Sequence, residues 1–371
     1  MIRVGITGQS GFIGSHLYNY LGLKSGFLRI HFEDNYFNSE SLLSEFAGNC
    51  DVIVHLAAMN RHEDPNVLYN TNIDLVKKLI SGIETSKSRP HVIFSSSIQE
   101  ESDNHYGRSK REGRLLFEKW ASDNGATFTA MVIPNVFGPY GKPYYNSVVA
   151  TFSHLLTHGG EPRIHVDGEL KLIYVNELVD QIYKVITGGV LETVFYVPYT
   201  SEKKVSVILE LLNSYKNQYL DKGIIPQMES EFEINLFNTF RSFIENSSYF
   251  PVRLVQHTDD RGTFVETMKL GVGGQVSFST TKPGITRGNH FHTRKIERFA
   301  VIKGKARIQL RRIGTDEIQE FILDGNEPSY VDMPVWVTHN ITNIGDDELL
   351  TVFWINEWFA PEDPDTYFEK V

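Results

Sequence analysis

Short apolar runs alternate with segments of helical periodicity over the first 200 residues. Four apolar runs predict buried strands: Ile2–Thr7, 51–57, 91–95 and 129–134. Apolar residues three and four positions apart predict helices from residue 14 and over 72–83. Strands that alternate with helices form a mostly parallel sheet covered on both faces. We therefore predict an α/β Rossmann-type, doubly wound domain over residues 1–245.

The pattern changes near residue 246. Residues 203–245 have helical periodicity, and the polar stretch 246–251 predicts a linker. Beyond it, turn residues separate five short strand-like runs: 274–280, 297–302, 306–311, 320–323 and Leu349–Ile355. Such runs are typical of an antiparallel barrel or sandwich. We therefore predict a second, all-β domain over residues 252–371.

The composition narrows the function classes. The 371 residues carry a net charge of −10, so a basic footprint for nucleic acid is absent. Cys50 is the single cysteine, which excludes an intrachain disulfide and a cysteine-based zinc cluster. No apolar run approaches the roughly 20 residues of a membrane span, and the first strand leaves no room for a signal peptide. We expect a cytoplasmic protein that binds neither nucleic acid nor membranes.

A glycine-rich turn follows the first strand and opens a helix. Glycines at this place allow a tight turn and a close approach of the backbone to a pyrophosphate, which the helix N-terminus attracts. A glycine triplet alone is weak evidence, but its position between strand and helix favours a dinucleotide site. The candidate cofactor-binding residues are Gly8, Gln9, Ser10, Gly11, Phe12, Ile13 and Gly14.

Tyr106 and Lys110 are four residues apart and share one face of a predicted helix. A lysine ammonium near a phenol lowers the pKa of the phenol and makes it an acid/base group near neutral pH. The pair alone also fits an ordinary exposed helix start. Three serines, 95–97, end the preceding strand, where a hydroxyl can hold a substrate carbonyl.

Together these residues resemble the extended short-chain dehydrogenase/reductase family, which includes nucleotide-sugar epimerases, dehydratases and reductases. The stretches 55–58, 134–139 and 172–178 and Asn72 fit the same family. The resemblance implies that Tyr106 is the catalytic acid/base and that Lys110 tunes it and holds the nicotinamide ribose. It also implies that Ser97, or Ser96, orients the carbonyl. Further residues expected near ligands are Leu56 and Ala57 at the cofactor and Asn135 at the nucleotide-sugar.

Two features depart from a simple match. The gap between Ser97 and Tyr106 is much shorter than this family usually shows, as if a loop over the substrate were missing. Glu33 and Asp34 end the predicted second strand, where an acidic residue favours NAD by bonding the ribose 2′-hydroxyl. The sugar-reductase relatives generally prefer NADPH, so the resemblance implies NADPH against this local signal. We expect NADPH.

Three histidines and a glutamate in the second domain form a candidate metal site. Residues two apart on a strand point to the same face, so His290 and His292 can reach one ion, with Glu297 and His339 completing the set. These ligand types suit zinc, iron, nickel or manganese. With Gly284 and Gly304 the spacing resembles the first cupin motif. We expect a cupin barrel that binds a divalent metal, and zinc is the metal that we favour. The alternative is a cupin in which the four residues only stabilise the structure.

Residues 257–266 and 287–291 resemble segments of the deoxysugar 3,5-epimerase cupins, in which the position of His290 is the proton-abstracting base. A histidine that ligates a metal is a poor base. Either the metal polarises the ketone instead, or another group, with Tyr330 and Lys295 as candidates, takes the proton. Arg261 and Arg287 are candidates for holding the nucleotide diphosphate.

The two halves together resemble the CapF-type capsular polysaccharide enzymes. The resemblance implies a bifunctional enzyme acting on a UDP-linked 2-acetamido-2,6-dideoxy-4-hexulose. The cupin would invert C3, and the reductase would then reduce C4 to give UDP-2-acetamido-2,6-dideoxy-L-talose, a precursor of UDP-N-acetyl-L-fucosamine. The alternatives are a 4-ketoreductase with a structural or dimerising cupin, and a non-catalytic sugar-nucleotide sensor. Relatives of both domains often form dimers, so we expect a homodimer.

Overall fold

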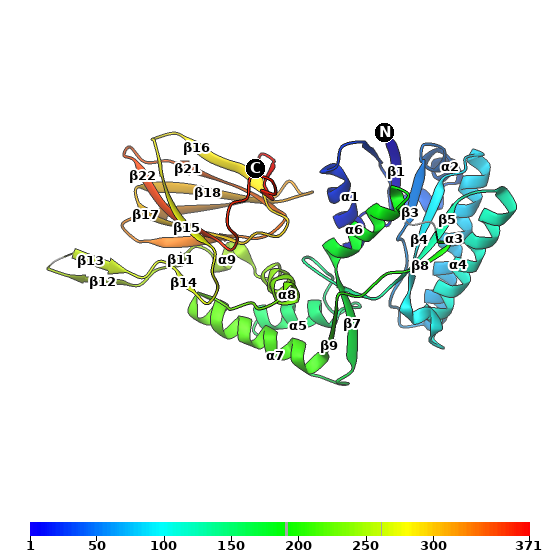
Figure 1. Cartoon of the computed structure of the whole chain (residues 1–371), viewed down its shortest axis with the longest axis horizontal. Helices are drawn as coiled ribbons and strands as arrows, with labels where there is room; N and C mark the ends of the chain where they lie inside the picture. Colours follow the sequence, from blue (N-terminus) through cyan, green and yellow to red (C-terminus); the bar gives the residue numbers. More distant parts are fainter. Residues whose placement is uncertain (190–191, 261) are drawn as a thin grey trace. The chain divides into compact units, whose positions relative to one another are not determined.

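The computed structural model describes residues 1–189, 192–260 and 262–371 (Figure 1). Its internal packing divides the chain into two compact units. Unit 1 contains Met1–Val148 and Asp167–Val205, and unit 2 contains Val149–Val166 and Ser206–Val371. The boundary that we drew at residues 245–252 rested on a change of sequence pattern, and it stays a prediction.

Unit 1 is built on a six-stranded parallel sheet in the order β2-β1-β3-β4-β5-β8. The strands are β1 (Ile2–Thr7), β2 (Phe27–Ile30), β3 (Val52–His55), β4 (His91–Ser97), β5 (Phe128–Ile133) and β8 (Val194–Tyr196). All residues of β3 and β5 are buried, as the continuous apolar runs in the sequence require. The parallel sheet confirms the predicted Rossmann-type fold.

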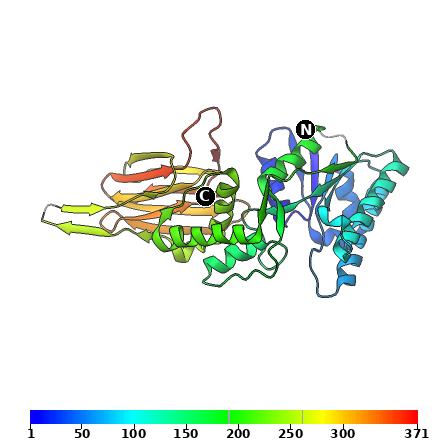
Figure 2. The same ribbon diagram turned by 60° about the horizontal axis from the view of Figure 1, so that its bottom comes forward.

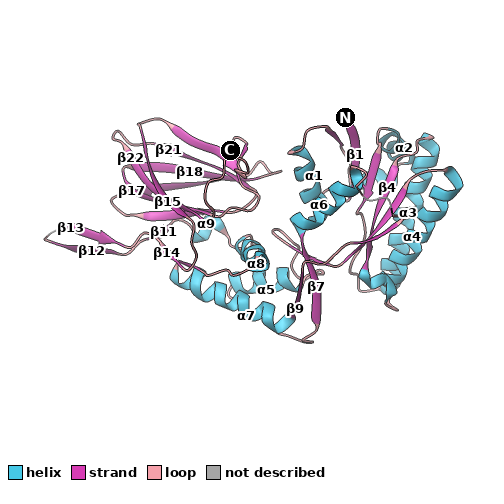
Figure 3. Ribbon diagram, in the orientation of Figure 1, coloured by secondary structure: helices cyan, strands magenta, loops and turns pink. Residues whose placement is uncertain are grey.

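Helices cover both faces of this sheet. Figure 3 shows α1 (Phe12–Gly22) and α6 (Val175–Ile186) on one side, with α2 (Glu40–Gly48), α3 (Pro65–Ser86) and α4 (His105–Asn124) on the other. Helix α3 begins seven residues before the predicted start at residue 72, because the Asp64 side chain caps it and Pro65 suits the first helical position. A second small sheet contains β6 (Asn135–Phe137), β7 (Glu169–Tyr174) and β9 (Ser201–Lys204).

The strand order places a binding crevice. The connection that follows β1 leads to β2 on one side, and the connection that follows β3 leads to β4 on the other, so the two connections separate above the sheet. Open parallel sheets bind ligands at such a point, outside the carboxyl ends of the strands.

Unit 2 contains two five-stranded antiparallel sheets. The first has the order β11 (Val252–Arg253), β20 (Ser329–Met333), β17 (Glu297–Lys303), β22 (Leu349–Ile355) and β15 (Gln275–Thr281). The second has the order β19 (Ile318–Asp324), β18 (Lys305–Arg312), β21 (Val337–Asn343), β16 (Thr286–Phe291) and β23 (Tyr367–Phe368). This architecture agrees with the expected cupin and includes all five predicted strand runs.

Helices and short strands complete unit 2. They are α5 (Val148–Thr157), α7 (Val205–Tyr215), η3 (Lys216–Leu220), β10 (Ile224–Ile225), α8 (Glu231–Arg241), α9 (Asn246–Tyr249) and β14 (Lys269–Leu270). The helical run predicted over 203–245 is therefore interrupted at β10. The predicted linker 246–251 instead contains α9, and Phe250 is buried in the core. Strands β12 (Gln256–Asp259) and β13 (Gly262–Val265) form a ribbon that extends away from the sheets in Figure 1 and Figure 2.

A buried ion pair joins the helices of unit 2 to the first sheet. The Arg298 guanidinium donates two hydrogen bonds to Asp332, at 2.7 and 2.9 Å, and Tyr219 on η3 donates a further one to the same carboxylate. The guanidinium carbon Cζ of Arg298 lies 3.8 Å from the Tyr330 ring centroid. Segment 216–220 is thus packed as part of unit 2.

Among the described residues, no helix has the length and apolar character that would let it cross a membrane.

Candidate functional sites

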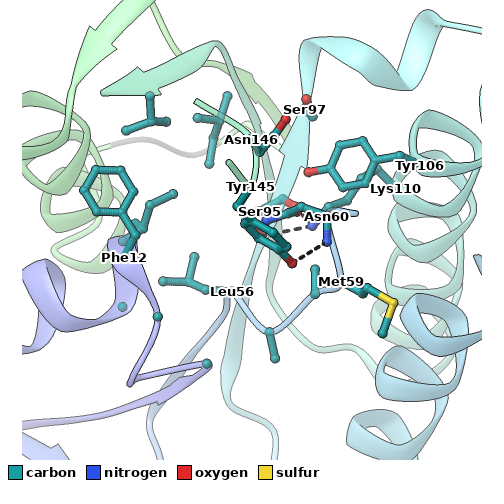
Figure 4. Close-up of a pocket in the computed structure, with 18 of the residues that line it drawn as sticks. Phe12, Leu56, Met59, Asn60, Ser95, Ser97, Tyr106, Lys110, Tyr145 and Asn146 are labelled. Atoms are coloured by element: carbon teal, nitrogen blue, oxygen red, sulfur yellow. Dashed lines mark hydrogen bonds between the residues drawn. The ribbon is translucent and has the colours of Figure 1, made fainter. Parts of the chain in front are cut away.

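A cavity of about 700 Å³ lies at the carboxyl ends of β1, β3, β4 and β5 (Figure 4). The glycine-rich turn forms one wall. Gly8 has φ +69°, and a Cβ on Gly14 would lie 2.2 Å from the Gly8 carbonyl oxygen, so both positions need glycine. The predicted cofactor residues in the lining are Gly8, Ser10, Gly11, Phe12, Ile13, Gly14, Leu56, Ala57 and Lys110. Gln9 is not among the lining residues.

The predicted acid/base pair lines the same cavity from α4 (Figure 4). Lys110 is buried, and its ammonium donates to the Ser95 carbonyl oxygen at 2.8 Å and lies 5.7 Å from the Tyr106 ring centroid. Burial lowers the pKa of Lys110 to about 8. Burial, with a smaller effect of Tyr145, raises the pKa of Tyr106 instead of lowering it as we had predicted. Without a bound cofactor, the Tyr106 phenol is therefore neutral.

The three serines at the end of β4 have different partners. Ser95 Oγ donates to the His55 carbonyl oxygen at 3.1 Å, and Ser96 Oγ donates to the Glu100 carboxylate at 2.5 Å. Ser97 Oγ accepts the Gln99 N–H at 3.2 Å, which leaves its own proton for a ligand in the cavity. Hydrogen bonding thus favours Ser97 over the other two as the carbonyl-orienting residue.

A single helical turn lies in the short gap between Ser97 and Tyr106, where we had inferred that a loop is missing. Residues Ile98–Glu101 form η2, and a Cβ on Gly107 would lie 2.0 Å from the Gln99 carbonyl oxygen. Arg114 donates to the Glu100 carboxylate at 3.2 Å and fixes this turn from α4. The glycine that follows Tyr106 therefore lets the turn pack directly on the helix.

The cavity lining also includes Tyr145, Asn135 and Asp34. Tyr145 had no signal in the sequence, yet it lines the cavity and its hydroxyl accepts the Asn60 N–H at 2.9 Å (Figure 4). Asn135 lines the cavity as expected. Asp34 lines it as well, while the Glu33 carboxylate accepts hydrogen bonds from His31 and Asn35.

The four predicted metal ligands lie together in unit 2. One potential ligand atom each from His290, His292, Glu297 and His339 falls within 4.8 Å of all the others. The β16–β21 pairing sets His290 opposite His339, and β17 supplies Glu297. Glu297 Oε2 lies 3.0 Å from His292 Nε2 and 3.2 Å from His339 Nε2. The buried Nε2 of His339 has no hydrogen-bond partner among the described residues, so a cation between these atoms would satisfy it.

The protonation states suit a cation. Burial, with the neighbouring His339 and His292, lowers the pKa of His290 to about 4 and leaves its imidazole neutral. Burial alone would raise the pKa of Glu297, but the neighbouring imidazoles of His292 and His339 outweigh it and hold that pKa below its usual range. Burial would lower the pKa of His292, but Glu297 outweighs it and raises that pKa, so an ion that binds this ring displaces a proton. The cluster thus pairs one carboxylate with imidazoles, as divalent transition metals require.

Three further residues named from the sequence are accounted for by other contacts or by the strand register. The strand register pairs Tyr330 with Ala300 and puts its side chain on the face opposite Glu297, so Tyr330 as a proton-transfer group is wrong. Lys295 is buried and donates to the Pro364 carbonyl oxygen at 2.7 Å. The Arg287 guanidinium donates to Thr281 Oγ1 and to the Thr280 carbonyl oxygen. Arg261 lies outside the described residues.

Family profiles match both halves of the chain. Residues 4–195 match the NAD dependent epimerase/dehydratase family, and residues 257–367 match the polysaccharide biosynthesis C-terminal domain. Pseudomonas aeruginosa has a relative named UDP-2-acetamido-2,6-beta-L-arabino-hexul-4-ose reductase. It is 35% identical over 370 residues, which cover 99% of this chain and 98% of that protein. The spore coat polysaccharide biosynthesis protein SpsL of Bacillus subtilis is 25% identical over 123 residues, or 30% of this chain and 82% of that protein.

Solved structures extend the comparison to the whole chain. The capsular polysaccharide assembling protein CapF from Staphylococcus aureus is 36% identical, covers 100% of both chains and gives a TM-score of 0.62. RMD from Pseudomonas aeruginosa, solved with NADPH, is 20% identical over 58% of this chain and 83% of its own, with a TM-score of 0.53, and shows the fold of unit 1 alone. The chain therefore belongs to the CapF-type capsular polysaccharide enzymes, with an NAD-dependent epimerase/dehydratase domain followed by a cupin domain.

Proposed function

We propose that unit 1 reduces the C4 ketone of a UDP-linked 2-acetamido-2,6-dideoxy-4-hexulose. The observation that carries this proposal is the convergence of Tyr106, Lys110 and Ser97 on one cavity with the glycine-rich turn. The name of the Pseudomonas aeruginosa relative describes a reductase of such a UDP-linked 4-hexulose. NADPH, when bound, supplies the hydride. Ser97 orients the carbonyl, Tyr106 gives its proton to the C4 oxygen, and the Lys110 charge stabilises the phenolate that remains.

The choice of NADPH rests on the resemblance to sugar reductases. Asp34 in the cavity lining opposes it, because a carboxylate repels a 2′-phosphate and bonds a free ribose hydroxyl. Comparing kcat/KM for NADPH and NADH with one substrate decides between them. A higher value for NADH would overturn the NADPH proposal without touching the reductase proposal.

We propose that unit 2 holds a divalent metal, zinc, and epimerises C3 of the same 4-ketone. His290, His292, Glu297 and His339 would hold the ion, whose Lewis acidity favours loss of the proton beside the ketone. Because proton removal at C3 needs the ketone, epimerisation comes before reduction. The product would be UDP-2-acetamido-2,6-dideoxy-L-talose, a precursor of UDP-N-acetyl-L-fucosamine for capsular polysaccharide.

Two variants separate the two activities. Tyr106→Phe should abolish NADPH oxidation with the 4-hexulose, while deuterium from solvent still enters C3. His290→Ala should abolish deuterium entry at C3, with NADPH oxidation retained on substrate that is already epimerised. NADPH oxidation at the parent rate in the Tyr106→Phe variant would contradict the reductase proposal. No deuterium entry with the parent protein would instead favour a 4-ketoreductase with a structural cupin.

A further inference from the structure

The metal-ligand cluster is tied to a segment far along the chain. His292 Nδ1 lies 2.5 Å from the backbone carbonyl oxygen of Asp365, 73 residues later, and both residues are buried. A carbonyl oxygen can only accept, so the ring carries its proton on Nδ1. Its Nε2 points toward Glu297 Oε2 at 3.0 Å and is the nitrogen left to bind an ion between the two groups. The Asp365 carbonyl therefore fixes both the tautomer and the direction of this ligand.

The Asp365 side chain holds that carbonyl in place. Its carboxylate accepts the backbone N–H groups of Thr293, Arg294 and Lys295 at 3.0–3.1 Å and the Thr293 hydroxyl at 2.6 Å. These donors form the turn that directly follows His292. Asp365 thus hydrogen-bonds the turn through its side chain and the His292 ring through its backbone carbonyl.

The backbone of Asp365 has an unusual conformation for this residue type. Its φ is +41°, in the left-handed region that favours glycine. The residue is 2% exposed, so the four bonds are shielded from solvent. The conformation is retained because the carboxylate bonds outweigh its cost.

The segment around Asp365 is anchored on the same turn. Arg294 pairs with Glu357 at 3.2 Å and with Asp363 at 2.8 Å, and Lys295 Nζ donates to the Pro364 carbonyl oxygen at 2.7 Å. We call residues 357–366 the C-terminal strap. The turn 293–295 thus contacts the strap at three residues besides Asp365.

We infer that Asp365 is a positioning residue for the metal centre, and that the C-terminal strap sets the affinity of unit 2 for its ion. This inference rests on the proposed metal site. Capping of the turn by the Asp365 carboxylate does not by itself require the backbone carbonyl of the same residue to accept a hydrogen bond from the His292 ring. The pairing of both contacts in one residue makes the second contact depend on the first, as outer-shell partners of metal-bound histidines do.

The test measures zinc affinity of the full chain by competition with a chromophoric chelator, without any activity assay. Asp365→Ala and Asp365→Gly should each weaken zinc binding by about 10–100-fold, the usual effect of losing an outer-shell partner. Glycine suits the positive φ, so its loss of affinity isolates the carboxylate from backbone strain. Asp365→Asn keeps one acceptor oxygen and should lie between these variants and the parent. Asp316→Asn, at an exposed residue outside the strap, is the matched control and should bind zinc like the parent.

A second readout follows the ligand directly. With Co²⁺ in place of zinc, the visible spectrum should change in Asp365→Gly and stay unchanged in Asp316→Asn. If Asp365→Ala and Asp365→Gly do not fold, Thr293→Val, which removes one of the four donors, must still weaken zinc binding. Parent-like affinity and spectra in all folded variants at 365 and 293 would overturn the inference. If the parent itself binds no zinc, the proposed metal centre fails instead.

Discussion

The buried His55 contributes to the response of unit 1 to acid. His55 is 1% exposed, and its Nδ1 shares a hydrogen bond of 2.7 Å with Thr7 Oγ1. Burial, with a smaller effect of the Lys110 charge, lowers the pKa of His55 to about 3 from 6.5. Between these values the unfolded chain binds a proton that the folded chain does not. The stability of the folded state therefore falls as the pH falls from 6.5 toward 3.

This dependence of stability on pH predicts how the His55→Asn variant behaves. One proton of difference changes the free energy of unfolding by about 1.4 kcal/mol per pH unit. The variant should lose less stability than the parent between pH 6.5 and pH 4.5, as measured by urea unfolding at a series of pH values. His31→Asn, at an exposed histidine, is the control. Equal pH slopes for the parent and His55→Asn would show that His55 does not titrate in this way.

A second prediction at this scale concerns Gly14. A Cβ there would lie 2.2 Å from the Gly8 carbonyl oxygen and force the glycine-rich turn open. Gly14→Ala should weaken NADPH binding at least about tenfold, measured by cofactor fluorescence, because the turn can no longer approach the pyrophosphate. Gly168→Ala, with nothing within 4 Å of its Cβ, should bind like the parent. Unchanged affinity in Gly14→Ala would remove the turn from the cofactor site.

Residue chemistry was readable from sequence where spacing within one element carried it. Tyr106 and Lys110 are four apart on α4, and the glycine-rich turn directly joins β1 to α1. Tyr145 and Asp365 were not predictable, because their roles depend on where a loop and a distant strap come to lie. The wrong assignment of Tyr330 has a related cause, since a one-residue change in strand register reverses the face of a side chain.

Among the elements, η2 controls the geometry of the reductase cavity. Gly107→Ala would bring a Cβ to 2.0 Å from the Gln99 carbonyl oxygen and push the turn away from Tyr106 and Ser97. We expect kcat for reduction to fall at least about tenfold, since misplaced catalytic groups cost rate steeply, while NADPH affinity changes little. Arg111→Ala, exposed on the same helix, should leave kcat unchanged. A change confined to NADPH affinity would contradict this role of η2.

The ion pair that joins η3 to the first sheet of unit 2 predicts a large stability effect. Asp332→Asn leaves the Arg298 charge buried without its full partner, which costs about 3–5 kcal/mol in the free energy of unfolding. Glu327→Gln breaks the exposed Arg253–Glu327 pair and should cost less than about 1 kcal/mol. Chemical denaturation measures both, and similar losses would show that the buried pair has no special weight.

Element prediction succeeded where apolar positions marked a strand and failed where polar residues are buried. The runs over β17, β18 and β22 were found from their patterns. Strands β20 and β21 are buried at every position, yet they contain Asp332 and His339 and so were not recognised. Burial of such groups depends on distant partners, such as Arg298, that spacing does not reveal.

At the scale of the whole molecule, the two proposed ligands should stabilise different units. A ligand that binds only the folded state raises its stability by mass action. NADPH should raise the melting temperature of unit 1, and chelation of zinc should lower that of unit 2. Calorimetry of Tyr106→Phe and His290→Ala, each with and without ligand, checks the assignment. A zinc effect that persists in His290→Ala would place the ion elsewhere. The predicted homodimer is checked separately by sedimentation.

The path of the chain through the two units determines the order in which their parts are synthesised and how the units can be separated. The chain passes from unit 1 to unit 2 after Val148, returns after Val166 and leaves again after Val205. During synthesis, α5 of unit 2 is made before β7, β8 and β9 of unit 1. No single peptide cleavage yields both units whole, and no single recombination crossover exchanges one of them intact. Separating either unit intact requires a break at all three of these crossings.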